Sequence, residues 1–402
     1  MAGASDGGFA FEVLETDGDA RTGTLHTAHG EVRTPAFVPL ATKGSVRGLS
    51  SSEVQELGYE MVLGNTFHLM LAPGAEAIAD AGGLHGFMGW EGAIITDSGG
   101  FQVFSLAHGG VADEIKGRRG ELPGSGAKVD ITEQGVAFRS LLDGSERFLG
   151  PEESMAVQAA LGSDIALAFD ECTPFHADRD YTAASMERTH RWLDRCIEWH
   201  REHGPSHQAL FAIVQGGVYE DLRTESASFA ASSEADGIAI GGSLGQDKEQ
   251  MYGVVGFTCA LLPASRPRHL LGVGEVDDLL EAVARGVDTL DCAVPTRLAR
   301  HGSALAPEPD ARFRIDLKRS RFTSDDSPLV EGCACEACRN HTRRYLNHLV
   351  RSQDLTGTRL LTLHNLSYME ALSRGCRDAI SAGEFDAYRG AVLGGSPPWS
   401  AG

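Results

Sequence analysis

The chain has 402 residues, 42% hydrophobic and 23% charged, a balance typical of a soluble globular protein. Its formal net charge of −21 argues against a protein that coats nucleic acid over its whole surface. The N-terminal segment lacks the basic start and apolar run of a signal peptide, and no stretch has the length of a membrane span, so we expect a cytoplasmic protein.

Eight short apolar segments rich in β-branched residues recur along the chain, with helix-like stretches between many of them. Several run directly into polar or glycine-rich loops, as at the active face of a (β/α)8 TIM barrel. We therefore predict this α/β fold, with an open doubly wound sheet as the competing architecture. The predicted strands are residues 35–40, 60–65, 93–97, 164–170, 209–215, 237–242, 268–274 and 287–293.

Two stretches between the strands have distinct patterns. Residues 180–203 form the longest helical pattern, with Met186, Trp192 and Leu193 spaced for one apolar face. Residues 107–130 are glycine-rich and mixed in charge, without clear periodicity. They predict a long loop over the active face.

Two aspartates, Asp97 and Asp291, each end a predicted buried strand. Such a pair can divide labour between nucleophile and proton carrier, as in glycoside-bond chemistry, although each could instead cap the helix after its strand. Asp170, at a similar strand end, can accept two hydrogen bonds from an amidine-like edge. Gln215 and the pair 241–242 add an amide and bare backbone that suit a planar heterocycle, although paired glycines often only permit turns.

Near the C-terminal end, the run Gly-Cys-Ala-Cys-Glu-Ala-Cys carries Cys333, Cys335 and Cys338. Thiolates this close repel one another, whereas a tetrahedral Zn²⁺ accepts three sulfurs and one imidazole. We predict one structural zinc ion; the alternative is reactive or merely buried thiols. The candidates for the fourth ligand, which spacing alone does not rank, are His341, His348 and His364.

A basic strip surrounds these cysteines. Residues 312–351 hold nine basic and five acidic side chains, so their net charge is +4 and that of the remaining chain is −25. Such a strip can bind phosphates at one location on an acidic protein, although a charge run is often only a solvated face.

Several motifs occur in a fixed order: TDSGGFQVFSL (96–106), FDECTPF (169–175), IVQGGVYEDLR (213–223), DCAVPTRLAR (291–300), and CACEAC (333–338) with LHNL (363–366). Together they resemble the tRNA-guanine transglycosylase family of the bacterial type, from about residue 9 to about residue 390. The resemblance implies one TIM-barrel catalytic domain over 9–390, with a zinc-binding, basic tRNA-docking subdomain at 310–366. It also implies a homodimer that exchanges guanine at the tRNA wobble position for 7-aminomethyl-7-deazaguanine, in queuosine biosynthesis.

Roles for individual residues follow from this resemblance. Asp291 is expected to attack the ribose C1′ and form a covalent intermediate, with Asp97 as its acid/base partner. Arg297 and Arg300 are expected to hold the anticodon strand, and His364 to be the fourth zinc ligand. Base recognition is expected from Phe101, Asp170, Cys172, Gln215, Gly242 and Leu271, with Phe101 and Leu271 on the two faces of the ring.

One segment departs from the family pattern. Residues 241–247 read Gly-Gly-Ser-Leu-Gly-Gln-Asp, where bacterial members usually read Gly-Gly-Leu-Ala-Val-Gly-Glu. Smaller side chains there favour queuine as an alternative incoming base. Two further alternatives are a non-catalytic tRNA-binding partner subunit and a glycoside hydrolase barrel that uses the same two carboxylates.

Overall fold

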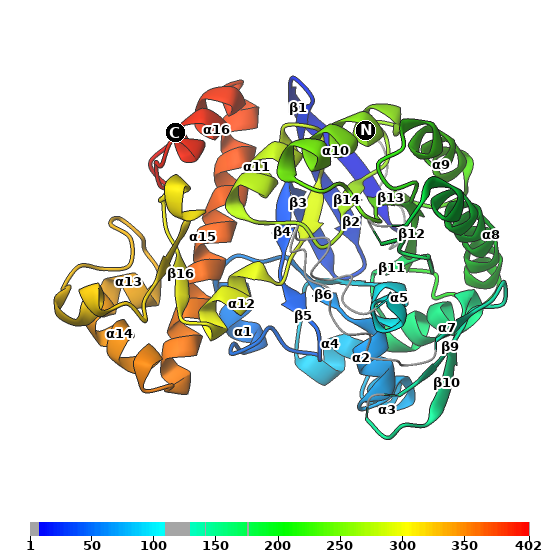
Figure 1. Ribbon diagram of the computed structural model, residues 1–402, viewed down its shortest axis with the longest axis horizontal. Helices are drawn as coiled ribbons and strands as arrows, with labels where there is room; N and C mark the ends of the chain where they lie inside the picture. Colours follow the sequence, from blue (N-terminus) through cyan, green and yellow to red (C-terminus); the bar gives the residue numbers. More distant parts are fainter. Residues whose placement is uncertain (1–7, 109–128, 141, 175–176, 402) are drawn as a thin grey trace.

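The computed structural model describes residues 8–108, 129–140, 142–174 and 177–401. The predicted loop at 107–130 lies almost wholly outside the described residues. Figure 1 shows a barrel with helices around it and, beside it, a smaller C-terminal lobe. None of the described helices combines the length and the apolar composition needed to cross a membrane.

The barrel is a parallel sheet that nearly closes on itself. Its first strand is interrupted at Pro39, which leaves β4 (Ala36–Val38) and β5 (Leu40–Ala41). Because β4 pairs with the last barrel strand and β5 with the second, this split strand joins the two ends of the sheet. The predicted (β/α)8 barrel is thereby confirmed. The other strands are β6 (Met61–Gly64), β7 (Ala93–Thr96), β11 (Ile165–Leu167), β12 (Ala209–Val214), β13 (Gly237–Ile240), β14 (Arg268–Leu270) and β15 (Thr289–Asp291).

The helices that follow these strands begin with clear local signals. The side chain of Asp178 accepts a hydrogen bond from the backbone N–H of Tyr181 at the start of α8, and Pro151 opens α7. These helices enclose the barrel (Figure 1). They are α1 (Ser51–Glu56), α2 (Thr66–Leu71), α3 (Ala75–Asp80), α4 (Gly83–Met88), α5 (Gly100–His108), α7 (Pro151–Leu161), α8 (Arg179–His203), α9 (Glu220–Ser232), α10 (Lys248–Leu261), α11 (Val276–Val283) and α12 (Val294–Arg300).

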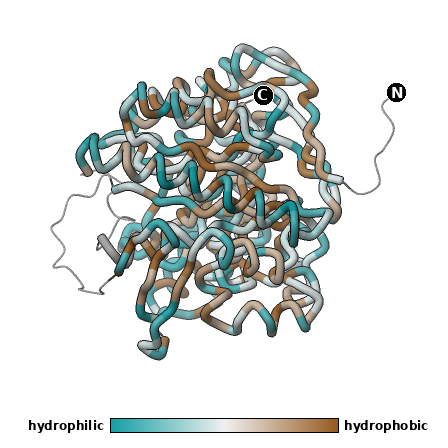
Figure 2. Tube along the Cα trace, turned by 90° about the vertical axis from the view of Figure 1, so that its right-hand side faces the viewer, coloured by the Kyte–Doolittle hydropathy of each residue, from teal (hydrophilic) through white to brown (hydrophobic). Residues whose placement is uncertain are grey.

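An antiparallel sheet covers the N-terminal end of the barrel. It consists of β1 (Ala10–Asp17), β2 (Ala20–Thr27) and β3 (Gly30–Thr34). Leu25 and Val32 of this sheet belong to the same buried apolar cluster as residues on the inner strands. In Figure 2, hydrophobic stretches accordingly pass through the interior of the molecule. The carboxyl ends of the strands lie at the opposite end, where the site is built. A second small antiparallel sheet, from residues with no strand prediction, contains β8 (Asp130–Ile131), β9 (Val136–Arg139) and β10 (Glu146–Leu149).

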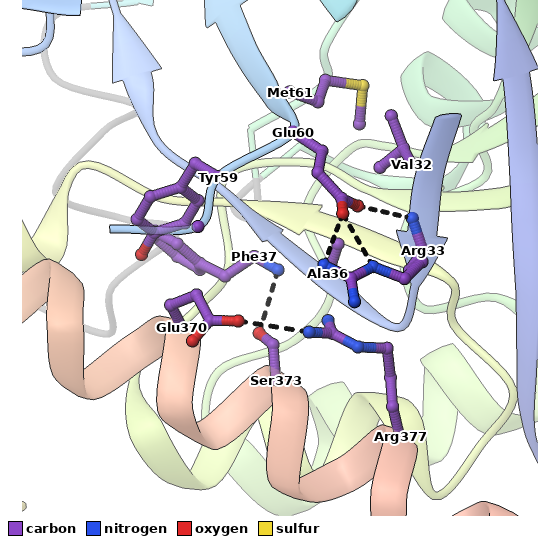
Figure 3. Close-up of a pocket in the computed structure, with 11 residues that line it drawn as sticks. Val32, Arg33, Ala36, Phe37, Tyr59, Glu60, Met61, Glu370, Ser373 and Arg377 are labelled. Carbon is purple, nitrogen blue, oxygen red and sulfur yellow. Dashed lines mark hydrogen bonds and ion pairs between the residues drawn. The ribbon is translucent and has the colours of Figure 1, made fainter. Parts of the chain in front are cut away.

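The longest described helix is α15 (Leu355–Ala382), with 28 residues, and the helix predicted over 180–203 is confirmed as α8, with 25 residues. Helix α15 is buried on most of its faces, and its apolar residues therefore do not follow a single stripe. Polar contacts attach it to the barrel. Ser373 Oγ accepts the backbone N–H of Phe37 at 3.1 Å (Figure 3), and Arg377 donates to the carbonyl of Pro35 at 2.9 Å.

The C-terminal lobe packs against the other part of α15 (Figure 1). Its hairpin strands are antiparallel and follow α12 directly, so the lobe begins next to the active face of the barrel. The lobe contains β16 (Ser303–Leu305), η1 (Pro309–Ala311), β17 (Arg314–Asp316), η2 (Ser320–Ser324), α13 (Glu336–Asn340) and α14 (Arg343–Arg351), and the chain ends after α16 (Phe385–Leu393).

Candidate active site and metal centre

A cavity of about 340 Å³ opens at the carboxyl ends of the barrel strands. Its polar residues lie at the carboxyl ends of the strands or in the loops and helices that follow them, as the sequence pattern predicted. Gln215 lies behind the cavity wall, and Arg300 is exposed at the end of α12. The other predicted residues of the barrel site all line the cavity: Asp97, Phe101, Asp170, Cys172, Gly242, Leu271, Asp291 and Arg297.

Asp97 follows β7 and is held by hydrogen bonds. The backbone N–H of Thr66 donates to its Oδ1 at 2.8 Å, the Asn65 amide donates to its Oδ2, and Gln102 Nε2 lies 3.3 Å from the same oxygen. Burial and, to a smaller extent, the nearby Asp291 together raise the pKa of Asp97 to about 7, and the Thr66 hydrogen bond limits the rise. Asp97 can therefore both give and take a proton near neutral pH.

Asp291 is the last residue of β15 and is 6% exposed. Its Oδ1 accepts the backbone N–H of Gly272 at 3.0 Å and lies 3.3 Å from Nε2 of the fully buried His269. The next helix has Ala293 at its N-cap, without a side-chain cap, so Asp291 does not cap that helix. Its carboxylate is thus fixed at the cavity and electrostatically coupled to Asp97.

One wall of the cavity contains a carboxylate and a thiol, with the Gln215 amide behind them. Asp170 accepts hydrogen bonds from Ser98 Oγ at 2.9 Å and from Gln215 Nε2 at 2.6 Å. Burial raises the pKa of Asp170 to about 6, and these two hydrogen bonds limit the rise. Burial also raises the pKa of Cys172, so it is a neutral thiol, and the backbone N–H of Gly242 faces its sulfur.

Some residues of the site were missed or left without a role by the sequence analysis. Gln102 contacts Asp97, but it lies in a segment whose pattern indicates an ordinary helix. His269 contacts Asp291, but it lies in a segment whose pattern indicates an ordinary strand. Asn65 ends the predicted strand 60–65 and received no role, because its contact with Asp97 joins two segments that are far apart in sequence.

A group of arginines lies beside the cavity. Arg297 lines the cavity, and Arg47 and Arg297 both lower the pKa of Arg300, after the larger effect of burial. Three guanidinium groups close enough to affect one another form a positive edge on an otherwise acidic protein. Arg47 could not be assigned to this group from its position in the sequence.

The structure brings Cys333, Cys335, Cys338 and His364 together as a buried group that could hold a metal ion. Nδ1 of His364 lies 3.7, 3.5 and 3.3 Å from the three sulfurs, in chain order. A tetrahedral zinc ion with ordinary bond lengths would separate nitrogen from sulfur by about 3.6 Å, so the donor set fits. Nε2 of His364 lies 2.9 Å from the carbonyl of Leu305; by donating there, it leaves Nδ1 free to bind a metal.

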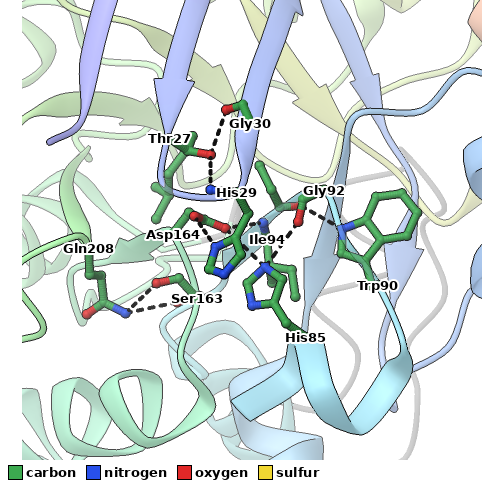
Figure 4. A network of polar contacts seen from close by, with 12 residues as sticks. Thr27, His29, Gly30, His85, Trp90, Gly92, Ile94, Ser163, Asp164 and Gln208 are labelled. Atoms are coloured by element: carbon green, nitrogen blue, oxygen red, sulfur yellow. Dashed lines mark hydrogen bonds and ion pairs between the residues drawn. The ribbon is translucent and has the colours of Figure 1, made fainter. Parts of the chain in front are cut away.

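A second group of possible ligands lies at the N-terminal end of the barrel (Figure 4) and contains His29, His85 and Asp164. Its hydrogen bonds argue against a metal ion. His85 Nε2 lies 3.0 Å from the carbonyl of Gly92, which requires a proton on that nitrogen, and His29 Nδ1 lies 2.7 Å from Asp164. The group instead fastens the turn between β2 and β3 to the start of β11.

The C-terminal lobe carries the predicted basic strip. Arg343 and Arg344 pair with Asp325 and Asp326. In the described part of the chain the other seven basic side chains of 312–351 have no ion-pair partner. Several of them line a hollow of about 300 Å³ together with His301, namely Arg314, Lys318, Arg319 and Arg321.

Comparisons with known proteins find one family over nearly the whole chain. A family model described as queuine tRNA-ribosyltransferase matches residues 16–397. A protein of Roseiflexus sp. (strain RS-1), named queuine tRNA-ribosyltransferase, is 48% identical over 395 residues, which cover 96% of this chain and 99% of that relative. Proteins of the same name from Symbiobacterium thermophilum and Synechococcus sp. (strain CC9311) are each 46% identical, over 95% and 94% of this chain and 90% and 95% of their own lengths.

Proposed function

Since the chain belongs to the queuine tRNA-ribosyltransferase family, we propose that it exchanges guanine at the wobble position of tRNA for 7-aminomethyl-7-deazaguanine. The observation that carries this proposal is the meeting of Asp97 and Asp291 at a cavity whose wall can read a purine edge. The reaction makes it a pentosyltransferase that works in the cytoplasm on queuosine biosynthesis.

The reaction begins at Asp291. Its carboxylate attacks the ribose C1′, the bond from C1′ to N9 of guanine breaks, and Asp97 supplies a proton to the leaving base. The hydrogen bond from Gly272 holds the attacking carboxylate in place. Asp97 suits the proton transfer because its pKa is raised to about 7.

The second half of the reaction runs the same steps in reverse, with the deazaguanine in place of guanine. Asp97 removes the proton from the ring nitrogen of the incoming deazaguanine, this nitrogen attacks C1′, and the Asp291 carboxylate leaves. Two inversions at C1′ give net retention. No high-energy cofactor is needed, because one N-glycosidic bond is exchanged for another of the same type.

The cavity wall supports recognition of a guanine-like base. The Asp170 carboxylate can accept two N–H groups from the amidine edge, and the Gly242 backbone can donate to a carbonyl oxygen. Gln215, which donates to Asp170 from behind the wall, is proposed to donate to the same carbonyl oxygen. Phe101 and Leu271 line the same cavity and are proposed to pack on the two ring faces.

We assign residues 310–366 to a tRNA-docking subdomain of a single catalytic domain that spans 9–390. Cys333, Cys335, Cys338 and His364 would hold one Zn²⁺, which supplies structural cross-linking and takes no part in the chemistry. The hollow that contains Lys318 would receive tRNA phosphates, and Arg297 with Arg300 would hold the anticodon strand. The active form is proposed to be a homodimer.

The alternative incoming base is queuine, and one observation favours it. Asp247, the acidic residue in the segment that departs from the family pattern, is exposed and caps α10 by accepting the N–H of Gln250 at 2.9 Å. It therefore offers no carboxylate to an aminomethyl group in the cavity. Incubation of the enzyme and tRNA with both bases, followed by mass analysis of the product nucleoside, separates the two candidates.

A radiolabelled guanine exchange assay tests the proposed function itself. The enzyme should exchange labelled guanine into tRNA and should not release guanine in the absence of an incoming base. A lack of exchange by the zinc-loaded protein would indicate a non-catalytic partner subunit, whereas steady release of guanine into water would indicate a glycoside hydrolase.

A further inference from the structure

Arg223 on α9 is 1% exposed, and in the described part of the chain its guanidinium contacts no carboxylate. It donates to backbone carbonyls instead: Nε to Gly217 at 2.8 Å, Nη1 to Val214 at 3.0 Å, and Nη2 to Gly241 at 2.9 Å and Ser243 at 3.5 Å. One buried cation thus joins the loop after β12 to the loop after β13. Burial of a charge without a counter-ion lowers the stability of the folded state. We therefore expect Arg223 to have a function beyond packing.

The contact with Gly241 fixes the direction of a peptide group at the cavity. In a trans peptide the carbonyl and the next N–H point to opposite sides. Because the Gly241 carbonyl points at Arg223, the N–H of Gly242 points the other way, toward Cys172. Both Gly242 and Cys172 line the cavity. The cavity therefore presents a hydrogen-bond donor at this position.

The opposite orientation is open to this segment unless something prevents it. Gly242 has a φ of +79°, and a Cβ there would lie 2.4 Å from Gln215 Oε1, so the position requires glycine. Glycine also permits the reversed peptide, which would turn the Gly241 carbonyl toward the cavity. A reversed peptide would present an acceptor in place of a donor. It would also leave Arg223 without one of its partners, and this cost opposes the reversal.

We propose that Arg223 is a positioning residue for base selection, which holds the Gly241–Gly242 peptide so that the cavity accepts purines with a carbonyl group at this edge and rejects those with an amino group. The inference rests on the proposed function, because it concerns the base that the enzyme exchanges. Arg223 acts through the backbone of Gly242 and touches neither Asp97 nor Asp291. Its loss should therefore weaken base binding more than it slows the chemical steps.

The test compares Arg223→Lys and Arg223→Met with the wild-type enzyme, each loaded with zinc. The KM for guanine should rise about tenfold or more, while kcat changes less. The inhibition constant of 2,6-diaminopurine, which carries an amino group in place of the guanine carbonyl, should rise less than the guanine KM or should fall. The preference for guanine over 2,6-diaminopurine, measured as the ratio of the inhibition constant to the guanine KM, should thus decrease about tenfold. The decrease should be smaller in Arg223→Lys than in Arg223→Met.

Arg266→Lys is the matched control. Arg266 also donates to backbone carbonyls, those of Ala230 and Ser233, but it does so at the other end of α9. This variant should keep the wild-type KM and the wild-type preference. The inference is overturned if the Arg223 variants keep the preference for guanine over 2,6-diaminopurine, or if kcat for guanine falls by as large a factor as its KM rises. If Arg223→Met does not fold, Arg223→Lys alone decides. Absence of exchange in the wild-type enzyme would instead refute the proposed function.

Discussion

Gln215 donates its amide N–H to Asp170 at 2.6 Å, so two side chains proposed to read the base are bound to each other. The Gln215 carbonyl oxygen is buried and has no hydrogen-bond partner in the described part of the protein. Each carboxylate oxygen can accept more than one hydrogen bond, so a base that enters can share Asp170 with Gln215. The contact therefore orients the Asp170 carboxylate for the N–H groups of the base.

Base binding should weaken at acidic pH. The pKa of Asp170 is raised to about 6 by burial, and only the ionised carboxylate can accept two N–H groups. The KM for guanine should therefore rise as the pH falls below about 6, which steady-state kinetics between pH 5 and 8 would measure. Asp170→Asn should raise the KM for guanine about 100-fold and remove this pH dependence. The NH₂ group of the Asn side chain would face an N–H group of the base, so two hydrogen-bond donors would meet. An unchanged pH dependence in Asp170→Asn would rule out Asp170 as its source.

The raised pKa of Asp97 makes a prediction about stability. In the folded protein its pKa is about 7 rather than the ordinary 3.8, so between these values the folded state binds the proton more tightly than the unfolded chain. The stabilising effect of this proton is complete below about pH 4 and is lost as the pH rises through 7. Asp97→Asn carries no charge and should be more stable than the wild type at pH 8, by up to about 4 kcal/mol.

Urea denaturation at pH 5 and pH 8 would measure this difference. The stability gain of Asp97→Asn should be smaller at pH 5, and a gain that does not depend on pH would contradict the assignment. The same substitution should abolish turnover. In the wild type, expulsion of guanine in a single turnover should slow as the pH rises above about 7, because it needs protonated Asp97.

Removal of the metal should destabilise the C-terminal lobe. Cys338→Ala or His364→Ala should reduce bound zinc from one ion per chain to well below one, measured by elemental analysis. Thermal unfolding should begin at lower temperature in these variants, since the ion would tie α13 to α15. Cys376→Ala is the control, because Cys376 is buried in the same helix as His364 but lies outside the metal group. Full metal content in His364→Ala would contradict the ligand assignment.

The basic hollow should determine the affinity for tRNA. Replacement of Lys318, Arg319 and Arg321 by alanine should raise the KM for tRNA about tenfold or more and lower the dependence of binding on salt. The KM for the free base should stay unchanged, because the hollow is separate from the barrel cavity. Arg201→Ala, on the exposed end of α8, is the control for a general loss of positive charge. Equal effects of this control would show that the hollow has no special role.

The barrel could be predicted from sequence because each strand is a short apolar run that ends in polar residues, as Asp97 and Asp291 do. The fourth member of the metal group could not be chosen from spacing, and the family resemblance selected His364. Contacts between distant loops could not be predicted, as between Arg223 and Gly241, because nothing in either segment indicates the other. The length of α15 was missed because burial on most faces removes the helical stripe.

The most direct test of the account is the covalent intermediate at Asp291. Wild-type enzyme mixed with tRNA, without an incoming base, should give a protein–RNA adduct that survives denaturing electrophoresis. Addition of guanine before denaturation should cleave the bond between Asp291 and the ribose, so that the adduct disappears. Asp291→Asn should form no adduct, although it should bind tRNA with an affinity similar to that of the wild type. An Asp291→Asn enzyme that exchanges guanine at the wild-type rate would contradict the proposed mechanism.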